Sequence, residues 1–88
     1  MLSVDFTTRR GKVVGYSILL LLSTPDGVET IRAFDSTHEY NEMHRYTRAG
    51  GKQEGTEFHS GTLGEGMRSA IDAIKQNHLE MIEGWRGL

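Results

Sequence analysis

The segment Lys12–Ser23, KVVGYSILLLLS, limits what this chain can fold into more than any other stretch. Its apolar residues are dense, and in a strand successive side chains point to opposite faces. The segment therefore favours the central strand of an antiparallel sheet. One set of alternate residues forms an unbroken row, which we expect to face a core: Val14, Tyr16, Ile18, Leu20 and Leu22.

The other set of alternate residues is polar in its middle and apolar at one end, so we expect it to be partly covered as well. Its apolar members are Val13, Leu19 and Leu21. The sequence offers one obvious cover, a C-terminal helix, and a helix with a single apolar stripe covers one face of a sheet. We therefore expect Val13, Leu19 and Leu21 to form the interface of a homodimer or of a complex with another protein.

Further segments have the composition and alternation of strands. They lie near residues 2–6, 28–35, 40–47 and 53–59. The turn Thr24–Gly27 separates residues 12–23 from residues 28–35, and the turn Ala49–Gly51 separates residues 40–47 from residues 53–59. The turns follow from Pro and Gly at the positions that tight turns require. The sequence predicts an α+β fold in one domain, with a meander-like antiparallel sheet of about five strands over residues 2–59.

A helix is predicted over about residues 63–83, packed on one face of that sheet. Thr62 and Glu65 have the spacing of a capping box, and Gly84 is suited to end the helix. One arc of the helix is apolar: Leu63, Met67, Ala70, Ile71, Ile74, Met81, Ile82 and Trp85. His78 falls within the same arc, so we expect it to be partly buried.

The composition excludes several classes of function. The chain has 88 residues, no cysteine, and ten basic against twelve acidic side chains. Disulfides and thiolate chemistry are excluded, and without a basic block nucleic acid is not an expected partner. The apolar run Ile18–Leu22 is too short for a membrane helix, and residue 1 onward has no signal-peptide pattern. We expect a cytoplasmic protein with no cofactor.

The candidate chemistry lies in a polar group that follows the third strand: Asp35, His38, Glu39, Glu42, His44 and Arg45. Within it, Asp35 and His44 could transfer protons and Arg45 could stabilise an oxyanion, as phosphodiester cleavage requires. His38, Tyr46 and His59 are candidate binding residues. His38, His44 and His59 could also ligate a metal beside a carboxylate. Their spacing matches no known ligand pair, so no metal site is predicted.

The segments Ile31–Asp35 and Met43–Tyr46, with His38 in the loop between them and a Gly-containing hairpin after them, resemble a group of uncharacterised prokaryotic proteins. That group is similar to the TumE-type toxin components of toxin–antitoxin pairs. The resemblance covers about residues 32–63. It implies a small α+β protein encoded beside a partner, with Asp35, His44, Arg45 and Tyr46 as the matching positions.

Two functional hypotheses follow from the sequence. The first is a non-enzymatic binding module that acts as a homodimer or as a subunit beside a protein partner. It depends on the surplus apolar surface of residues 12–23. The alternative is a ribonuclease-like toxin that uses Asp35, His44 and Arg45, and only in that case would nucleic acid be a partner.

Overall fold

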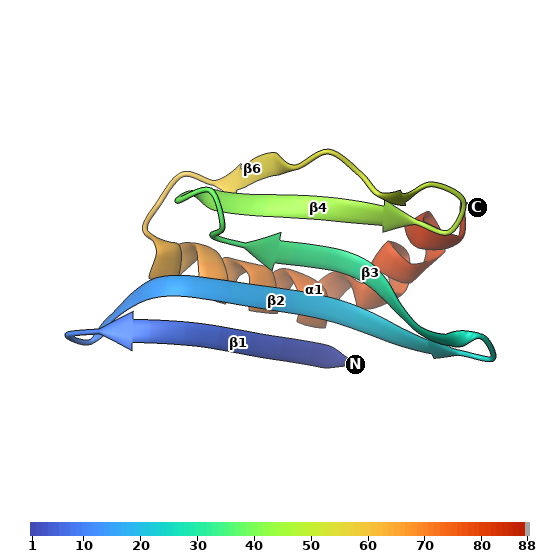
Figure 1. Ribbon diagram of the computed structural model, residues 1–88, viewed down its shortest axis with the longest axis horizontal. Coiled ribbons are helices and arrows are strands. Elements are labelled where there is room, and N and C mark those ends of the chain that lie inside the picture. The colour runs from blue at the N-terminus through green and yellow to red at the C-terminus, as the bar shows by residue number, and fades with distance from the viewer. Residues whose placement is uncertain (88) are drawn as a thin grey trace.

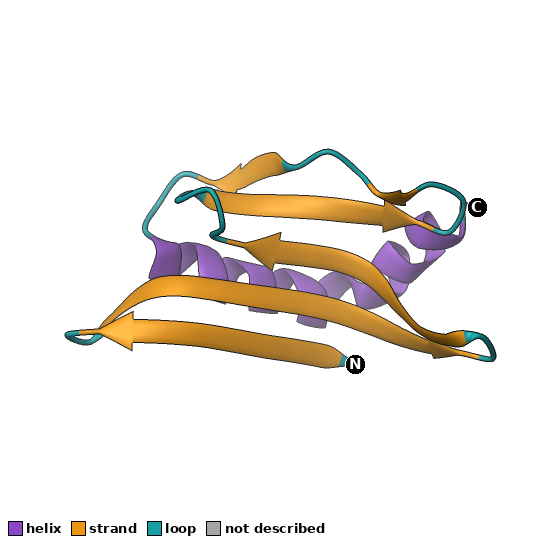
Figure 2. Ribbon diagram, viewed as in Figure 1, coloured by secondary structure: helices purple, strands orange, loops and turns teal. Residues whose placement is uncertain are grey.

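A computed structural model describes residues 1–87 and has an antiparallel sheet with one helix packed on one of its faces (Figures 1 and 2). This confirms the predicted α+β fold. The elements are β1 (Leu2–Arg9), β2 (Lys12–Thr24), β3 (Gly27–Asp35), β4 (Asn41–Thr47), β5 (Gly51–Lys52), β6 (Thr56–His59) and α1 (Leu63–Arg86). The strands β1 to β4 follow one another in space as in sequence, and β4 pairs with both β5 and β6.

The core lies between the sheet and α1. The sheet contributes one row of β2 together with two side chains of β3, and the helix contributes its apolar stripe. The buried members are Tyr16, Ile18, Leu20, Ile31, Phe34, Ala70, Ile74, Met81 and Trp85. Most of the row predicted from residues 12–23 is therefore confirmed, and the helix covers it.

A β-bulge changes the predicted row at its beginning. Pairing between β1 and β2 shifts after Thr7, so that Thr7 is opposite Gly15 and Thr8 is opposite Val13. Val14 is the extra residue and is 48% exposed, whereas Val13 packs against the core beside Gly64. The expectation that Val14 is buried was wrong, because a bulge inserts one residue and breaks the strict alternation. Val13 consequently does not lie on the open face with Leu19 and Leu21.

The predicted fifth strand is interrupted. β5 pairs with the end of β4 and β6 pairs with its beginning, while residues 53–55 between them are not in a strand. A Cβ atom on Gly55 would collide with the side chains of Glu42 and His44. The chain leaves the ladder here (Figure 1), and Gly55 passes close to these two side chains of β4.

The helix begins as predicted and ends later. The capping box of Thr62 and Glu65 is present. Gly84 stays helical, and the helix ends with Gly87 in the left-handed conformation at φ 83°. The additional residues include Trp85, which is 7% exposed and whose carbonyl oxygen accepts a hydrogen bond of 2.8 Å from the Arg48 N–H. His78 is exposed, contrary to expectation.

The strand β1 lies at the margin of the area that α1 covers (Figure 1). The helix packs on β2, β3, β4 and β6. Leu2, Val4 and Phe6 are opposite core residues of β2 and so point to the helix side of the sheet, yet they are 36%, 41% and 52% exposed. Among the described residues, no helix has the length and apolar character that crossing a membrane requires.

Candidate functional site

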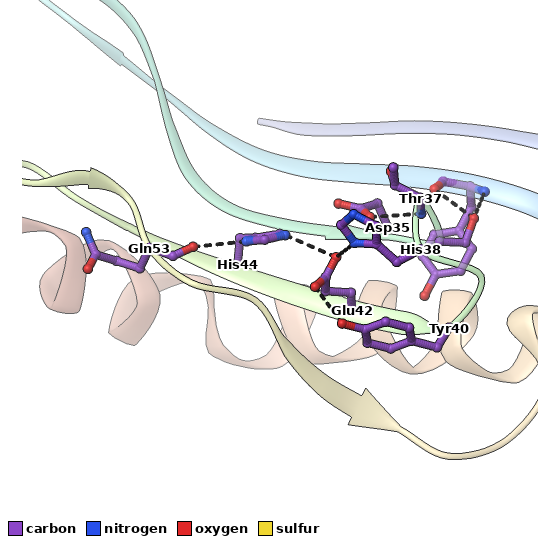
Figure 3. Close-up of polar contacts among 9 residues, drawn as sticks. Asp35, Thr37, His38, Tyr40, Glu42, His44 and Gln53 are labelled. Carbon is purple, nitrogen blue, oxygen red and sulfur yellow. Dashed lines mark hydrogen bonds and ion pairs between the residues drawn. The ribbon is translucent and has the colours of Figure 1, made fainter.

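A cluster of polar side chains lies on the face of the sheet away from α1. Asp35, at the end of β3, is directly opposite Glu42 of β4. Residues two apart on a strand share a face, so His44 lies beside Glu42. One oxygen or nitrogen atom from each of Asp35, Glu42 and His44 lies within 4.8 Å of those of the other two. Figure 3 shows these side chains converging above β3 and β4.

Glu42 is the centre of the cluster and is only 5% exposed. Its Oε2 accepts a hydrogen bond of 2.7 Å from the Tyr40 hydroxyl, and its Oε1 accepts one of 2.8 Å from Nδ1 of His38. These hydrogen bonds, with Tyr40 contributing most, lower the pKa of Glu42 to about 2. Glu42 is therefore a buried carboxylate that stays ionised at neutral pH.

The ring of His44 is oriented by the segment that interrupts the outer strand. Nδ1 of His44 lies 2.9 Å from the carbonyl oxygen of Gln53 and donates a hydrogen bond to it, because a carbonyl can only accept. The other ring nitrogen, Nε2, lies 3.3 Å from Oε1 of Glu42. Gly55 gives the segment the close approach that this contact needs. Neither Gln53 nor Gly55 was singled out from the sequence, since the contact depends on where the outer strand breaks.

A tight turn brings His38 to the same carboxylate. The Thr37 N–H donates to Oδ1 of Asp35 at 3.0 Å, and Glu39 has a positive φ of 68°. The chain thereby reverses before β4 begins, and His38 lies above Glu42 although it precedes the strand (Figure 3). Its side chain is 65% exposed, so the cluster has one side open to solvent.

Arg45 does not join Asp35 and His44. It is the residue opposite Arg32 of β3, and both arginines line a cavity of about 620 Å³ between the sheet and α1. Burial and the neighbouring Arg45 lower the pKa of Arg32. Asp35 and His44 therefore meet on one face of the sheet, and the cation grouped with them for catalysis lies on the other face.

The remaining predicted binding residues are dispersed. Tyr46 packs against the core cluster. His59 lies in the segment that leads to the helix, where its Nδ1 accepts a hydrogen bond of 3.0 Å from the Gly61 N–H. Leu19 and Leu21 are half-buried on the open face of β2. Only His38 of the predicted binding residues contacts the cluster around Glu42.

The cluster can move protons or hold a cation. It combines two carboxylates with two imidazoles and the Tyr40 hydroxyl, and no cation of Arg or Lys is among its contacts in the described part of the chain. Such a set lacks the oxyanion-stabilising group that the ribonuclease hypothesis takes from Arg45.

Comparisons with known proteins give a family and no activity. A family model described as a domain of unknown function matches residues 1–86. No curated protein and no solved structure matches the chain. The match does not connect the chain to the toxin components that its sequence resembles.

Proposed function

The chain belongs to the DUF7718 family, and we propose that it is a non-enzymatic binding module that acts as a homodimer joined along β1. The observation that carries this proposal is the exposed apolar row on that strand. Leu2, Val4 and Phe6 continue the core of the sheet beyond the cover of the helix and remain 36–52% exposed. They are more exposed than Leu19 and Leu21, the residues first expected to form the interface.

The free edge of β1 supports pairing with another strand. The Met1 amino group donates to the Leu21 carbonyl and the Leu21 N–H donates to the Met1 carbonyl, both at 2.8 Å. In an antiparallel ladder such pairs of reciprocal backbone hydrogen bonds recur at every second residue. The odd-numbered residues of β1 therefore bond to β2, and the backbone groups of the even-numbered residues point outward. Leu2–Thr8 carries no Pro or Lys, which commonly protect edge strands.

The register of the dimer follows from the same alternation. A two-fold axis at Val4 would pair Val4 with its own copy and Leu2 with Phe6 of the partner subunit, and the outward backbone groups of all three would form hydrogen bonds. A register centred on Asp5 would place two carboxylates directly opposite each other, which is destabilising. The apolar pairing at Val4 is therefore the favoured arrangement.

The mass of the protein in solution tests the proposal. We expect light scattering after size exclusion to give twice the chain mass of 9.9 kDa. Val4→Asp should give the chain mass itself, because a charge would enter the apolar contact. Val28→Asp is the matched control, since Val28 is 60% exposed and lies on β3 away from β1.

A second variant tests the backbone contact separately. Val4→Pro removes an outward N–H that has no partner within one chain, and edge strands accept Pro at such positions. We expect a folded monomer by circular dichroism and light scattering. A wild-type protein that stays at 9.9 kDa up to millimolar concentration, or a Val4→Asp variant that remains dimeric, would refute the proposed dimer.

A further inference from the structure

We propose that Asp35, Glu42 and His44 form a binding site for one divalent first-row transition-metal ion of the zinc class. The site is independent of the dimer, because it lies on the other face of the sheet from the exposed row of β1. Three features of the cluster support this site: the spacing of its three donors, the orientation of His44 and the placement of two carboxylates opposite each other.

The spacing of the donors suits a metal of this size. Two ligands that are each about 2.1 Å from a tetrahedral zinc ion lie about 3.4 Å apart. Nε2 of His44 and Oε1 of Glu42 are 3.3 Å apart. Asp35 has an oxygen within 4.8 Å of both, so a rotation of its half-buried carboxylate would complete a three-ligand set.

His44 is oriented in the way that is usual for a histidine that binds a metal ion. A ligating imidazole usually donates its other N–H to a carbonyl or carboxylate, which fixes the tautomer. His44 donates Nδ1–H to Gln53, so in the neutral ring Nε2 carries a lone pair. That lone pair faces an oxygen of ionised Glu42. A metal ion between these two atoms would bind both of them.

The placement of the two carboxylates also favours a divalent cation. Asp35 and Glu42 are opposite one another on adjacent strands, an arrangement that is unfavourable for two carboxylates. Within residues 1–87, the ion pairs of Glu42 are with His38 and His44, and neither Lys nor Arg contacts it. A divalent cation would neutralise both carboxylates. Nitrogen and oxygen donors of this kind suit zinc and its neighbours better than calcium.

The ion would retain an open coordination position. Three protein ligands leave room for water or a small ligand on the solvent side, where His38 is 65% exposed. His38 contacts the same oxygen of Glu42 and therefore positions the Glu42 carboxylate without ligating the ion. Its removal should therefore weaken metal binding less than the removal of a ligand.

The binding of Zn²⁺ to tag-free protein, measured by calorimetry, tests the site. We expect one ion per chain. His44→Ala and Asp35→Asn should each weaken binding by at least about 100-fold, and His38→Ala by no more than about 10-fold, since changes around metal ligands commonly cost 10- to 100-fold. His78→Ala is the matched control because His78 is exposed on the helix, and it should bind as wild type does. Circular dichroism checks that each variant is folded.

The nitrogen chemical shifts of the His44 ring test whether His44 is a ligand of the ion. On addition of Zn²⁺, Nε2 of His44 should shift while its Nδ1–H stays bonded to Gln53. If His44→Ala binds Zn²⁺ as tightly as wild type, the site is elsewhere and the assignment is wrong. If folded wild-type protein binds no Zn²⁺ up to millimolar concentration, the three side chains form only a hydrogen-bonded cluster and the proposal fails.

Discussion

At the scale of single residues, Asn41 connects more of the molecule than any residue singled out from the sequence. It is 1% exposed. Its Oδ1 accepts a hydrogen bond of 2.7 Å from the Tyr16 hydroxyl, and its Nδ2 lies 3.1–3.2 Å from the carbonyl oxygens of His59, Gly61 and Thr62. The helix residue Gly66 fits only because it has no Cβ, which would collide with this amide. One side chain therefore joins β2, β4 and the start of the helix.

Replacing Asn41 by Ala should cost about 3 kcal/mol of unfolding free energy, because each buried partner left without a hydrogen bond costs about 1–3 kcal/mol. Urea denaturation measures the change. Asn77→Ala, on the exposed side of the helix, is the control and should have little effect. A loss below about 1 kcal/mol for Asn41→Ala would show that the amide does not hold these elements together.

Glu42 should make the stability of the protein sensitive to acid. Its folded-state pKa of about 2 is below the ordinary value of 4.5. The ionised form is therefore favoured by folding, and its contribution is complete above pH 4.5 and is lost as the pH falls toward 2. The difference in unfolding free energy between wild type and Glu42→Gln should shrink over this range.

Urea denaturation at several pH values between 2 and 7 measures that difference. Glu29→Gln serves as the control, since it removes one carboxyl from an exposed position on β3. If the advantage of wild type over Glu42→Gln is the same at both ends of the range, the hydrogen bonds from Tyr40 and His38 do not stabilise the ionised carboxylate.

The residues of the site could be found from the sequence only in part. The alternation along residues 40–47 places Glu42 and His44 on one face and Arg45 on the other, and the structure agrees for these three. The meeting of His38 with Glu42 depends on the positive φ of Glu39, and the orientation of His44 depends on a carbonyl nine residues later. Neither contact follows from periodicity.

At the scale of elements, the start of the helix was the most predictable boundary. The Thr62 hydroxyl accepts from the Glu65 N–H at 3.2 Å, and the Glu65 carboxylate accepts from the Thr62 N–H at 2.9 Å. The latter hydrogen bond lowers the pKa of Glu65. Local chemistry decides this boundary, and therefore four consecutive residues were enough to predict it.

Thr62→Ala should destabilise the protein by about 1 kcal/mol, the usual cost of losing a helix cap. Thermal unfolding, followed by circular dichroism, measures the effect. Ser60→Ala is an exposed neighbour outside the capping box and should leave the midpoint nearly unchanged. Equal shifts for the two variants would mean that the cap contributes nothing specific.

The elements that were predicted incorrectly are those whose geometry depends on a distant neighbour. The bulge that exposes Val14 arises where β2 pairs with β1, and the alternation of residues 12–23 does not reveal it. The helix continues through Gly84 because Trp85 docks beside Arg48, far away in sequence. The break at residues 53–55 likewise reflects the side chains of β4 that lie beneath it.

At the scale of the whole molecule, the sequence predicts a sheet with a helix packed on one face. It does not predict how much of the sheet the helix covers. An apolar row on residues 12–23 and one amphipathic helix suffice to predict a sheet with a helix on one face. The sequence does not give the path of the helix across the sheet. That path leaves β1 uncovered and moves the surplus apolar surface from Leu19 and Leu21 to Leu2, Val4 and Phe6.

The two margins of the sheet are unequal, and this limits how many copies can join. β1 offers eight residues of continuous strand, whereas the opposite margin is divided into β5 with two residues and β6 with four. The proposed pairing along β1 would occupy the long margin of both copies, and the divided margin is a poor template for further strands. A protein of this shape can associate through its sheet and still end as a closed pair, without seeding a fibre.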